Sequence, residues 1–282
     1  MYKVGIIGSG NQSARIQKIL KKLNKKFYIY KPERAKNYYD NNSFQNLKKC
    51  KIIFILSPNK THFYYIKLLA KNRYIFCEKP PVTNIRQLKL LSRYNNGNIY
   101  FNFNFRFSTF NEILKNHKKY NLGKLLSGNI YACHGLSFKK EYIKNWRSNK
   151  KYNPLGVLEM VLVHYIDMIN FNFSLSRPTS IDLNNFSKKG TSPDTCNISF
   201  KHGNSKIDFF ATYSSPFYQK ILLLFENGYI EQKDNLLEIR GPRMILNKKG
   251  QFIKPKLIKK INSNQLTDFN RSLLKSVKFF LN

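Results

Sequence analysis

The first hundred residues alternate short apolar runs with longer segments in which apolar residues recur at helical spacing. The run Ile52–Leu56 is apolar throughout, whereas Gln12–Leu23 places its apolar residues on one helical face. Strands that alternate with helices are typical of parallel βαβ units, so we expect a doubly wound parallel sheet of the Rossmann type in residues 1–120. The predicted strands are Tyr2–Ile7, Phe27–Tyr30, Ile52–Leu56, Tyr74–Cys77 and Ile99–Asn104, and the predicted helices are Gln12–Leu23, His62–Lys71 and Ile85–Tyr94.

The pattern changes after Gly123, where most apolar runs are short and separated by glycine or asparagine. Asn227-Gly228 lies between two such runs and is a strong hairpin signal. Residues 121–282 are therefore expected to form an α+β domain with a large, mostly antiparallel open sheet, which makes the whole chain α/β. Its predicted strands are Leu126–Cys133, Ser180–Leu183, Thr195–Lys201, Lys206–Tyr213, Lys220–Phe225, Tyr229–Gln232 and Leu236–Arg240, and its predicted helices are Leu155–Asn170 and Leu266–Leu281.

Composition limits the protein class. A chain of 282 residues with 42% hydrophobic content can fill two cores. The four cysteines form no CxxC or Cys/His pair, so we expect reduced thiols and neither a disulfide framework nor a metal site. The chain enters its first strand without a charged and apolar leader, and its apolar runs are too short to span a bilayer. A cytoplasmic protein without a membrane partner is expected.

A net charge of +35 would ordinarily suggest a nucleic-acid partner. Here the lysines are spread along the chain among abundant asparagine, isoleucine and tyrosine, and no basic arm or zinc finger concentrates them. Nucleic-acid binding is therefore not favoured. The positive charge can still attract anionic ligands to a cleft.

A glycine-rich turn follows the first predicted strand and opens the first helix. In Gly8-Ser9-Gly10-Asn11-Gln12-Ser13 the first glycine permits a tight turn, and the second lets a pyrophosphate approach the backbone at the helix N-terminus. Ser13 is small enough for close packing at the third position. A purely structural turn is the alternative, but the flanking βαβ pattern favours a nucleotide site.

Two further loops lie at the carboxyl ends of predicted strands, where ligands bind in such sheets. The loop after the second strand offers Lys31 and Arg34 where an acid would favour NAD, and basic groups suit the 2′-phosphate of NADP. NADP is thus slightly favoured over NAD, although lysine is common throughout the chain. The loop Ser57-Pro58-Asn59-Lys60-Thr61-His62 either contacts the cofactor or only begins a helix.

The fourth predicted strand ends in Cys77-Glu78-Lys79-Pro80. Hydride leaves a carbinol carbon only as its hydroxyl loses a proton, and a lysine within hydrogen-bond reach can relay that proton. Lys79 beside a nucleotide-binding loop therefore points to a dehydrogenase. An ordinary surface lysine is the competing interpretation.

Taken together, the motifs resemble the Gfo/Idh/MocA oxidoreductases, which include glucose–fructose oxidoreductase and inositol dehydrogenase. The resemblance runs over nearly the whole chain and implies a Rossmann domain followed by an α/β domain whose open sheet often builds oligomers. Members usually continue past the helix predicted over Leu266–Leu281 with a last helix that packs back on the domain. The motifs are Gly8-Ser9-Gly10, Ser57-Pro58-Asn59-Lys60-Thr61-His62, Cys77-Glu78-Lys79-Pro80, Trp146-Arg147, Gly156-Val157-Leu158 and His164-Tyr165-Ile166-Asp167.

The resemblance implies roles for single residues. Lys79 is the expected catalytic lysine, placed by a turn at Pro80 whose peptide bond can be cis, and Glu78 is expected beside the nicotinamide ribose. His164 falls where the family has its active-site histidine, although a core histidine is the alternative. Many members carry an Asp four residues earlier, where this chain has Met160, and the neighbouring Glu159 lies on another helical face.

Further candidates are Asn104 and Arg106, expected on the same side of the fifth strand, and Trp146-Arg147, which resembles a loop that reaches over the cofactor. Arg106 and Arg147 are expected to bind substrate, or else to be solvated surface charges. The expected cofactor contacts are Gly8, Ser9, Gly10, Asn11, Gln12, Lys31, Arg34, Ser57, Pro58, Asn59, His62, Glu78, Lys79, Asn104, Trp146 and Arg147.

These observations predict an NAD(P)-dependent oxidoreductase that moves hydride to or from a hydroxyl or carbonyl carbon of a sugar, cyclitol or nucleotide-activated sugar. Lys79 and His164 are the acid–base candidates, and a homo-oligomer formed through the second sheet is expected. A catalytically silent nucleotide-binding sensor or scaffold of the same fold is the alternative, and Met160 is the feature in its favour.

Overall fold

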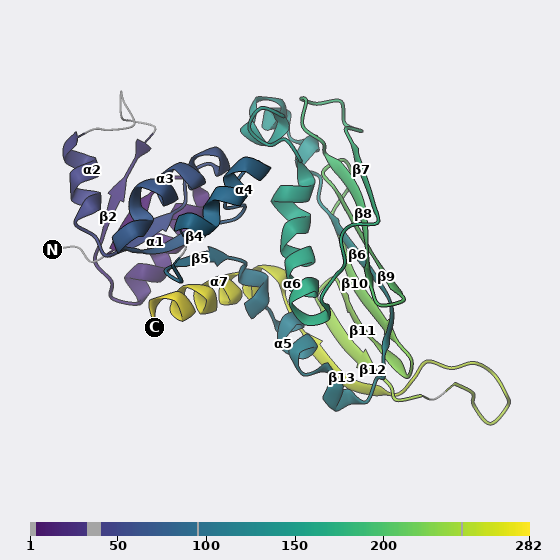
Figure 1. Cartoon of the computed structure of the whole chain (residues 1–282). Helices are drawn as coiled ribbons and strands as arrows, with labels where there is room; N and C mark the ends of the chain where they lie inside the picture. Colours follow the sequence, from purple (N-terminus) through teal and green to yellow (C-terminus); the bar gives the residue numbers. More distant parts are fainter. Residues whose placement is uncertain (1–3, 33–40, 95, 244) are drawn as a thin grey trace. The chain divides into compact units, whose positions relative to one another are not determined.

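The structure, a computed structural model, describes residues 4–32, 41–94, 96–243 and 245–282. The chain divides into two compact units (Figure 1). The first contains the described residues up to Phe103 together with Leu274–Asn282, and the second contains Asn104–Leu273.

The first unit is built on a five-stranded parallel sheet in the order β2-β1-β3-β4-β5. The order reverses between β1 and β3, so the loops that leave these two strands lie at the topological switch point. The strands are β1 Val4–Ile7, β2 Phe27–Tyr30, β3 Ile52–Ile55, β4 Tyr74–Glu78 and β5 Ile99–Asn102, and the helices between them are α1 Asn11–Lys22, α2 Asn41–Lys48, α3 His62–Leu69 and α4 Ile85–Leu91. The predicted doubly wound sheet is confirmed.

Apolar strands hold this unit together because both faces of the sheet are covered. Ile53, Phe54 and Ile55 are fully buried, as are Ile75 and Phe76 in β4. A parallel sheet covered on both faces needs such continuous apolar runs, which is why the runs were visible in the sequence.

Helix α7, Gln265–Leu281, passes through the division between the units, and its residues from Leu274 onward belong to the first. The Phe280 ring lies 5.5 Å from that of Phe54 and 5.4 Å from that of Phe76, centroid to centroid. The C-terminal part of α7 therefore packs on the sheet of the first unit.

The second unit contains an eight-stranded sheet in the order β13-β12-β11-β10-β6-β9-β8-β7, antiparallel except where β6 pairs with β9. Helix α6, Val163–Phe173, lies along one face of this sheet (Figure 1), and the core between them includes Ile169, Ile130 and Leu223. The strands are β6 Leu125–Cys133, β7 Ser180–Asn184, β8 Thr195–His202, β9 Ser205–Thr212, β10 Tyr218–Phe225, β11 Gly228–Lys233, β12 Leu236–Arg240 and β13 Leu257–Asn262. The predicted, mostly antiparallel sheet is confirmed.

The division differs from the predicted boundary at residue 120. Residues 104–120 belong to the second unit because Phe110, Leu114 and Tyr120 are buried in its core. Helix α5, Thr109–Lys115, forms within this stretch and was not predicted. Neither were α2 and β13: the first is short and polar, and the second is largely exposed and rich in lysine, so both lack the expected apolar periodicity.

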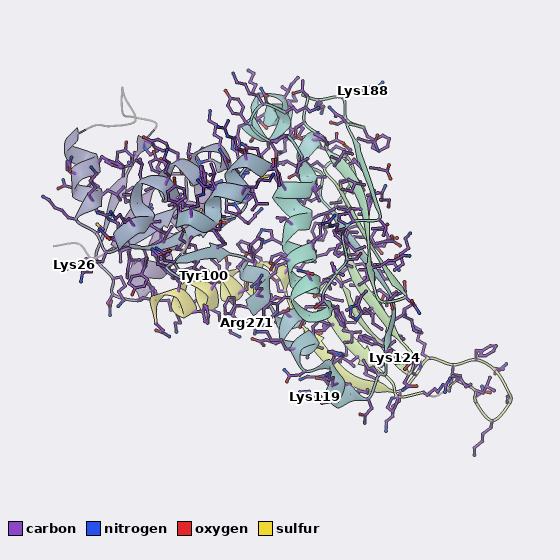
Figure 2. All side chains as sticks on the ribbon, in the orientation of Figure 1. Lys26, Tyr100, Lys119, Lys124, Lys188 and Arg271 are labelled. Carbon is purple, nitrogen blue, oxygen red and sulfur yellow. The ribbon has the colours of Figure 1, made fainter. Side chains whose placement is uncertain are left out.

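The basic side chains are dispersed. Figure 2 shows exposed Lys119, Lys124 and Lys188 extending from different parts of the second unit. Among the helices that the structure describes, none is long and apolar enough to cross a membrane.

Candidate cofactor and substrate sites

The turn after β1 needs glycine at one position and leaves space at another. Gly8 has φ +107°, and an added Cβ would lie 2.8 Å from the Leu56 carbonyl oxygen, so a side chain is excluded there. Gly10 precedes α1, and a Cβ added to it would meet no atom of the described chain within 4 Å. The first turn of α1 carries no acidic side chain. These features fit a dinucleotide pyrophosphate approaching the backbone above Gly10.

The loop after β3 lies against this turn. The Leu56 amide donates a 2.9 Å hydrogen bond to the Ile7 carbonyl oxygen. Within the loop, Ser57 Oγ and Thr61 Oγ1 are 2.6 Å apart, and Thr61 Oγ1 donates to the Pro58 carbonyl oxygen over 2.7 Å. Asn59 is buried. The loop is therefore ordered by its own contacts and ends at the switch point, where a cofactor contact is expected.

His62, the first residue of α3, joins this loop to the one that carries Lys79. Its ring is fully buried, with Nε2 2.8 Å from the Ser57 carbonyl oxygen and Nδ1 2.7 Å from that of Pro80. Carbonyl oxygens only accept, so a neutral ring donates to one of them and an imidazolium to both. Burial lowers the pKa of His62, the two carbonyl oxygens act in the opposite direction, and the charge of Lys79 lowers it further.

Glu78, at the end of β4, is the centre of a buried hydrogen-bond network. Its Oε1 accepts from Gln12 Nε2 at 2.8 Å and from Asn102 Nδ2 at 2.7 Å. Ser276 Oγ in α7 donates to Asn102 Oδ1 at 2.7 Å and lies 2.8 Å from the Tyr100 hydroxyl. Burial raises the pKa of Glu78, whereas the bonds from Asn102 and Gln12 and the charge of Lys79 lower it.

Lys79 follows directly and is 8% exposed, so it is not an ordinary surface lysine. The Lys79–Pro80 peptide bond is cis. Lys31 is half-buried just after β2, whereas Arg34 lies outside the described residues. The network at Glu78 includes Asn102, Tyr100 and Ser276, which sequence reasoning missed. Asn102 was detectable as a lone polar residue in an apolar strand.

The second unit holds a cavity of about 330 Å³. Of the residues predicted to bind substrate, only His164 lines it. The other lining residues are Phe105, Ser108, Phe110, His134, Met160, Val161, Tyr165, Met168, Phe217, Gln219, Ile221, Gln232, Gln265, Asp268, Phe269 and Ser272.

His164 lies near the start of α6, directly after a π-helical turn over Leu158–Leu162. Its ring stacks on Phe105, with centroids 4.8 Å apart and planes at 23°. Met160 lines the same cavity, whereas Glu159 is buried elsewhere and its charge acts on Tyr213. Met160 and His164 therefore line the same cavity, as expected from their spacing. The carboxylate of Glu159 does not take the place of the Asp that many family members carry at position 160.

Arg106 does not line the cavity. Its Nε donates to Asp167 Oδ2 at 2.7 Å and its terminal nitrogen to Oδ1 at 2.6 Å, and the guanidinium lies 4.7 Å from the Phe171 ring centroid. The Asp167 carboxylate is therefore engaged by Arg106. The predicted substrate contact of Arg106 stays a prediction.

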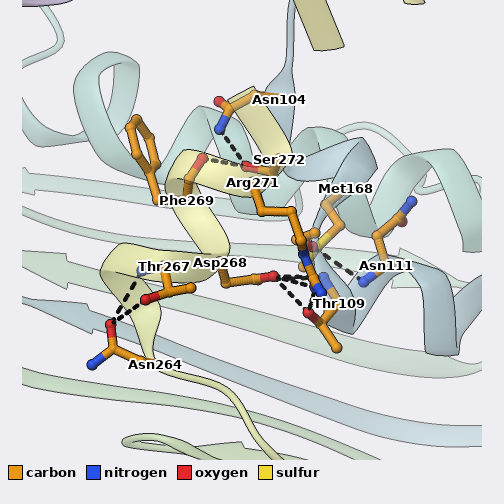
Figure 3. Close-up of polar contacts among 11 residues, drawn as sticks. Asn104, Thr109, Asn111, Met168, Asn264, Thr267, Asp268, Phe269, Arg271 and Ser272 are labelled. Atoms are coloured by element: carbon orange, nitrogen blue, oxygen red, sulfur yellow. Dashed lines mark hydrogen bonds and ion pairs between the residues drawn. The ribbon is translucent and has the colours of Figure 1, made fainter. Parts of the chain in front are cut away.

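Asn104 corrects a second expectation. The strand β5 ends at Asn102, and Asn104–Phe107 form a 3₁₀ turn, so Asn104 and Arg106 do not alternate along a strand. Asn104 is buried, and its Nδ2 donates to Ser272 Oγ in α7 at 2.9 Å (Figure 3). The strand ends early because these side chains are bound locally in the second unit.

Arg147 stacks on its neighbour, with the guanidinium 4.5 Å from the Trp146 ring centroid. Burial lowers the pKa of Arg147, and the nearby Tyr213 acts in the opposite direction. Neither Trp146 nor Arg147 lines the cavity. Their predicted contacts with cofactor and substrate remain predictions.

Sequence reasoning missed the polar side chains that the sheet contributes to the cavity. The Tyr165 hydroxyl accepts a hydrogen bond from Gln219 Nε2 at 2.7 Å. Gln232 and His134 also line the cavity. Burial raises the pKa of Tyr165 and lowers that of His134. Gln219 and Gln232 take core-facing positions in β10 and β11, where alternation calls for apolar residues, and this is the signal that could have found them. Among the described residues, no group of three His, Cys, Asp or Glu side chains is placed to hold a metal.

Residues 2–96 match the model of an oxidoreductase family with an NAD-binding Rossmann fold. A search of curated proteins finds no match. A dehydrogenase (MviM) from Clostridium difficile is similar in structure, with a TM-score of 0.72 and 20% identity over 99% of this chain and 89% of that chain.

Two other solved structures are similar over most of their length. An inositol dehydrogenase homologue from Azotobacter vinelandii, complexed with NAD+, has a TM-score of 0.74 and 14% identity over 99% of this chain and 85% of its own. Levoglucosan dehydrogenase with NADH and L-sorbose has a TM-score of 0.78 and 14% identity over 99% and 88%. At these identities the likeness shows the fold alone.

The buried His62 generates a pH prediction. Its folded pKa lies below the ordinary value of 6.5, so as pH falls the unfolded chain takes up the proton first and stability decreases. We expect the melting temperature of the parent to fall between pH 7 and pH 5 more steeply than that of His62→Gln. At pH 7 His62→Gln should cost about 1–3 kcal/mol, because one carbonyl oxygen loses its donor.

His202→Gln is the matched control, since His202 lies half-buried in the second unit, and it should keep the parental slope. Equal slopes in the parent and in His62→Gln, measured by thermal melts across this range, would contradict the prediction.

Proposed function

We propose that the chain is an NAD(P)-dependent dehydrogenase or reductase of the Gfo/Idh/MocA type, and the match of residues 2–96 to the model of that family's NAD-binding Rossmann domain supports this. Its reaction moves a hydride to or from a hydroxyl or carbonyl carbon of a sugar or cyclitol. The observation that supports this best is the burial of Lys79, which is only 8% exposed. It directly follows Glu78, whose carboxylate accepts a hydrogen bond from Gln12 in α1, the helix that begins at the glycine turn.

The glycine turn and its neighbours would hold the cofactor. The pyrophosphate would lie above Gly10 at the N-terminus of α1, flanked by Ser9 and Asn11, with the loop at Ser57–Asn59 on the other side of the switch point. Glu78 would meet the nicotinamide ribose. Lys31 would favour NADP over NAD by pairing with the 2′-phosphate. A bound nicotinamide supplies the hydride acceptor or donor.

Lys79 would move the proton of the reacting hydroxyl. The fully buried His62 lies 2.7 Å from the carbonyl oxygen of the next residue, Pro80, which supports a defined position for Lys79. His164 would share this task or orient the sugar, since imidazole titrates near neutrality.

The named neighbours agree with a sugar-like substrate. The solved structures described above include an inositol dehydrogenase homologue and a levoglucosan dehydrogenase. Those activities belong to those proteins, and for this chain they support a polyol or sugar.

A catalytically silent nucleotide sensor is the second candidate. Met160 lines the cavity together with His164 where a carboxylate was expected from the resemblance, and the Asp167 carboxylate pairs with Arg106. In that case the protein binds cofactor and turns over nothing.

We also propose that two copies associate through the outer face of the eight-stranded sheet. Tyr131, Tyr218 and Leu224 are exposed there, and the Tyr131 ring lies 6.1 Å from those of Phe210 and Tyr218. These apolar side chains point away from the core that faces α6. A contiguous apolar patch on a polar face marks an interaction site, and a second copy presents the same patch.

Substitutions at the two glycines of the turn form a matched pair that tests the cofactor site, because Gly8 has no space for a side chain and Gly10 has. Gly10→Asp should keep the parental melting temperature, since the added side chain meets no atom, and should lower NADPH affinity at least tenfold by steric and charge conflict with the pyrophosphate. Gly8→Ala should instead destabilise the fold, because of the 2.8 Å contact. NADPH and NADH fluorescence titrations measure both variants, and Lys31→Ala should weaken NADPH selectively. Parental NADPH affinity in Gly10→Asp would refute the cofactor site.

Lys79→Ala should keep NADPH binding and lose about 10²–10⁴-fold in kcat, the usual contribution of a general acid or base. Lys71→Ala changes an exposed lysine of the same unit and should retain full activity. The measurement is reduction of NADP+ and NAD+ with sugar and cyclitol panels. Lys79→Ala turning over as fast as the parent would show the assignment to be wrong, and binding without turnover in the parent would favour the sensor.

Tyr131→Lys should shift the native mass from oligomer to monomer, as it adds charge to the centre of the outer face. Phe252→Lys changes a more exposed aromatic residue, 88% against 37% for Tyr131, outside that face and should leave the mass unchanged. Light scattering after size exclusion measures both. A monomeric parent at assay concentrations would overturn this proposal.

A further inference from the structure

The wall of the second-unit cavity is almost free of formal charge, although the chain carries +35. Among the described residues that line it, none is a lysine or an arginine. The one carboxylate, Asp268, accepts from the Thr109 amide at 3.1 Å and from Arg271 at 2.7 Å, and is thus already engaged (Figure 3). Burial lowers the pKa of His134, which favours its neutral form.

An uncharged wall limits what can be bound there. A phosphate or carboxylate buried without a cationic partner costs several kcal/mol, so the cavity disfavours a substrate that places such a group inside it. Within the substrate class that the motifs allowed, the wall therefore favours neutral sugars over nucleotide-activated, phosphorylated and acidic ones.

The polar groups that remain suit neutral hydroxyls. Strands β10 and β11 contribute the amides of Gln219 and Gln232, and Tyr165 contributes a hydroxyl. An amide both donates and accepts, which matches a hydroxyl that does the same.

The helical side of the cavity supplies most of its apolar lining, beside the polar Ser108, Gln265 and Ser272. Met160 and Met168 come from the π-helical turn and from α6, and Phe105, Phe110 and Phe269 come from the turns and helices around them. Aromatic and thioether side chains bind C–H surface better than hydroxyls. A sugar seated in this cavity would place hydroxyls at Gln219 and Gln232 and a hydroxyl-poor part of its surface against the methionine and phenylalanine side chains.

We propose that the cavity binds an uncharged sugar or cyclitol with one apolar face, such as a deoxy, anhydro or O-methyl sugar, and rejects anionic sugars. The proposal rests on the dehydrogenase function for turnover, but the binding preference is a property of the second-unit wall alone.

Matched probes that differ at one position test it. Glucose, 6-deoxyglucose, glucose 6-phosphate and glucuronate differ only at C6, and myo-inositol, its O-methyl ether and its 1-phosphate form a second set. We expect neutral probes, and above all the deoxy and O-methyl compounds, to raise the melting temperature of the full chain with NADPH present. Their Kd should be at least tenfold below those of the anions. Tighter binding of an anionic probe, or no binding by any neutral one, overturns the proposal.

Charge added to the wall should reverse the preference. Gln219→Lys and Met160→Lys each place a cation in the cavity and should favour glucose 6-phosphate or the inositol phosphate by at least tenfold. Gln251→Lys adds the same charge to an exposed position outside the cavity and should keep the parental order. Retention of the parental order in both cavity variants, when folded, contradicts the proposal.

The two proposals fail in different ways. If no cofactor binds while neutral sugars still raise the melting temperature, the dehydrogenase function fails and the cavity assignment stands. If NADPH binds and only anionic sugars bind with it, the function stands and the cavity assignment fails.

Discussion

The first unit depends on how the buried carboxylate of Glu78 is satisfied. A carboxylate at the end of a central strand is costly unless donors surround it, and here Gln12 and Asn102 supply them from α1 and β5. Ser276 extends the network into α7. One acidic side chain therefore fixes the start of the nucleotide-binding helix, two strand ends and the last helix relative to each other, and Lys79 follows it by a single peptide bond.

The features that the sequence predicted correctly are those set by neighbouring residues in the chain. The continuous apolar runs gave the parallel sheet, because a sheet covered on both faces permits little else, and the motif-based resemblance is confirmed by the match over residues 2–96. The glycine turn was predictable from Gly8 and Gly10, since each has a separate steric reason. Lys79 and its cis bond followed from the motif around Pro80.

Long-range partners were not predictable. Arg106 pairs with Asp167, sixty-one positions away, and Asn104 with Ser272, 168 positions away, so nothing in the spacing of either residue reveals that it is already engaged. Both had been assigned to ligands because polar residues at a strand end usually face the crevice. The strand ends two residues earlier than predicted, and in the 3₁₀ turn Asn104 is buried whereas Arg106 stays partly exposed.

The contrast between the chain's charge and its cavity sharpens the choice between enzyme and sensor. Among the described residues, no lysine or arginine lines the cavity, although the chain contains fifty of them, and the proposed role of this wall is to bind hydroxyls and apolar surface. A sensor that binds only the cofactor does not require a cavity lined by a histidine for a second ligand. Met160 then acts as part of a specificity wall, because a thioether beside His164 excludes no proton transfer and favours a substrate that is poor in hydroxyls on that side.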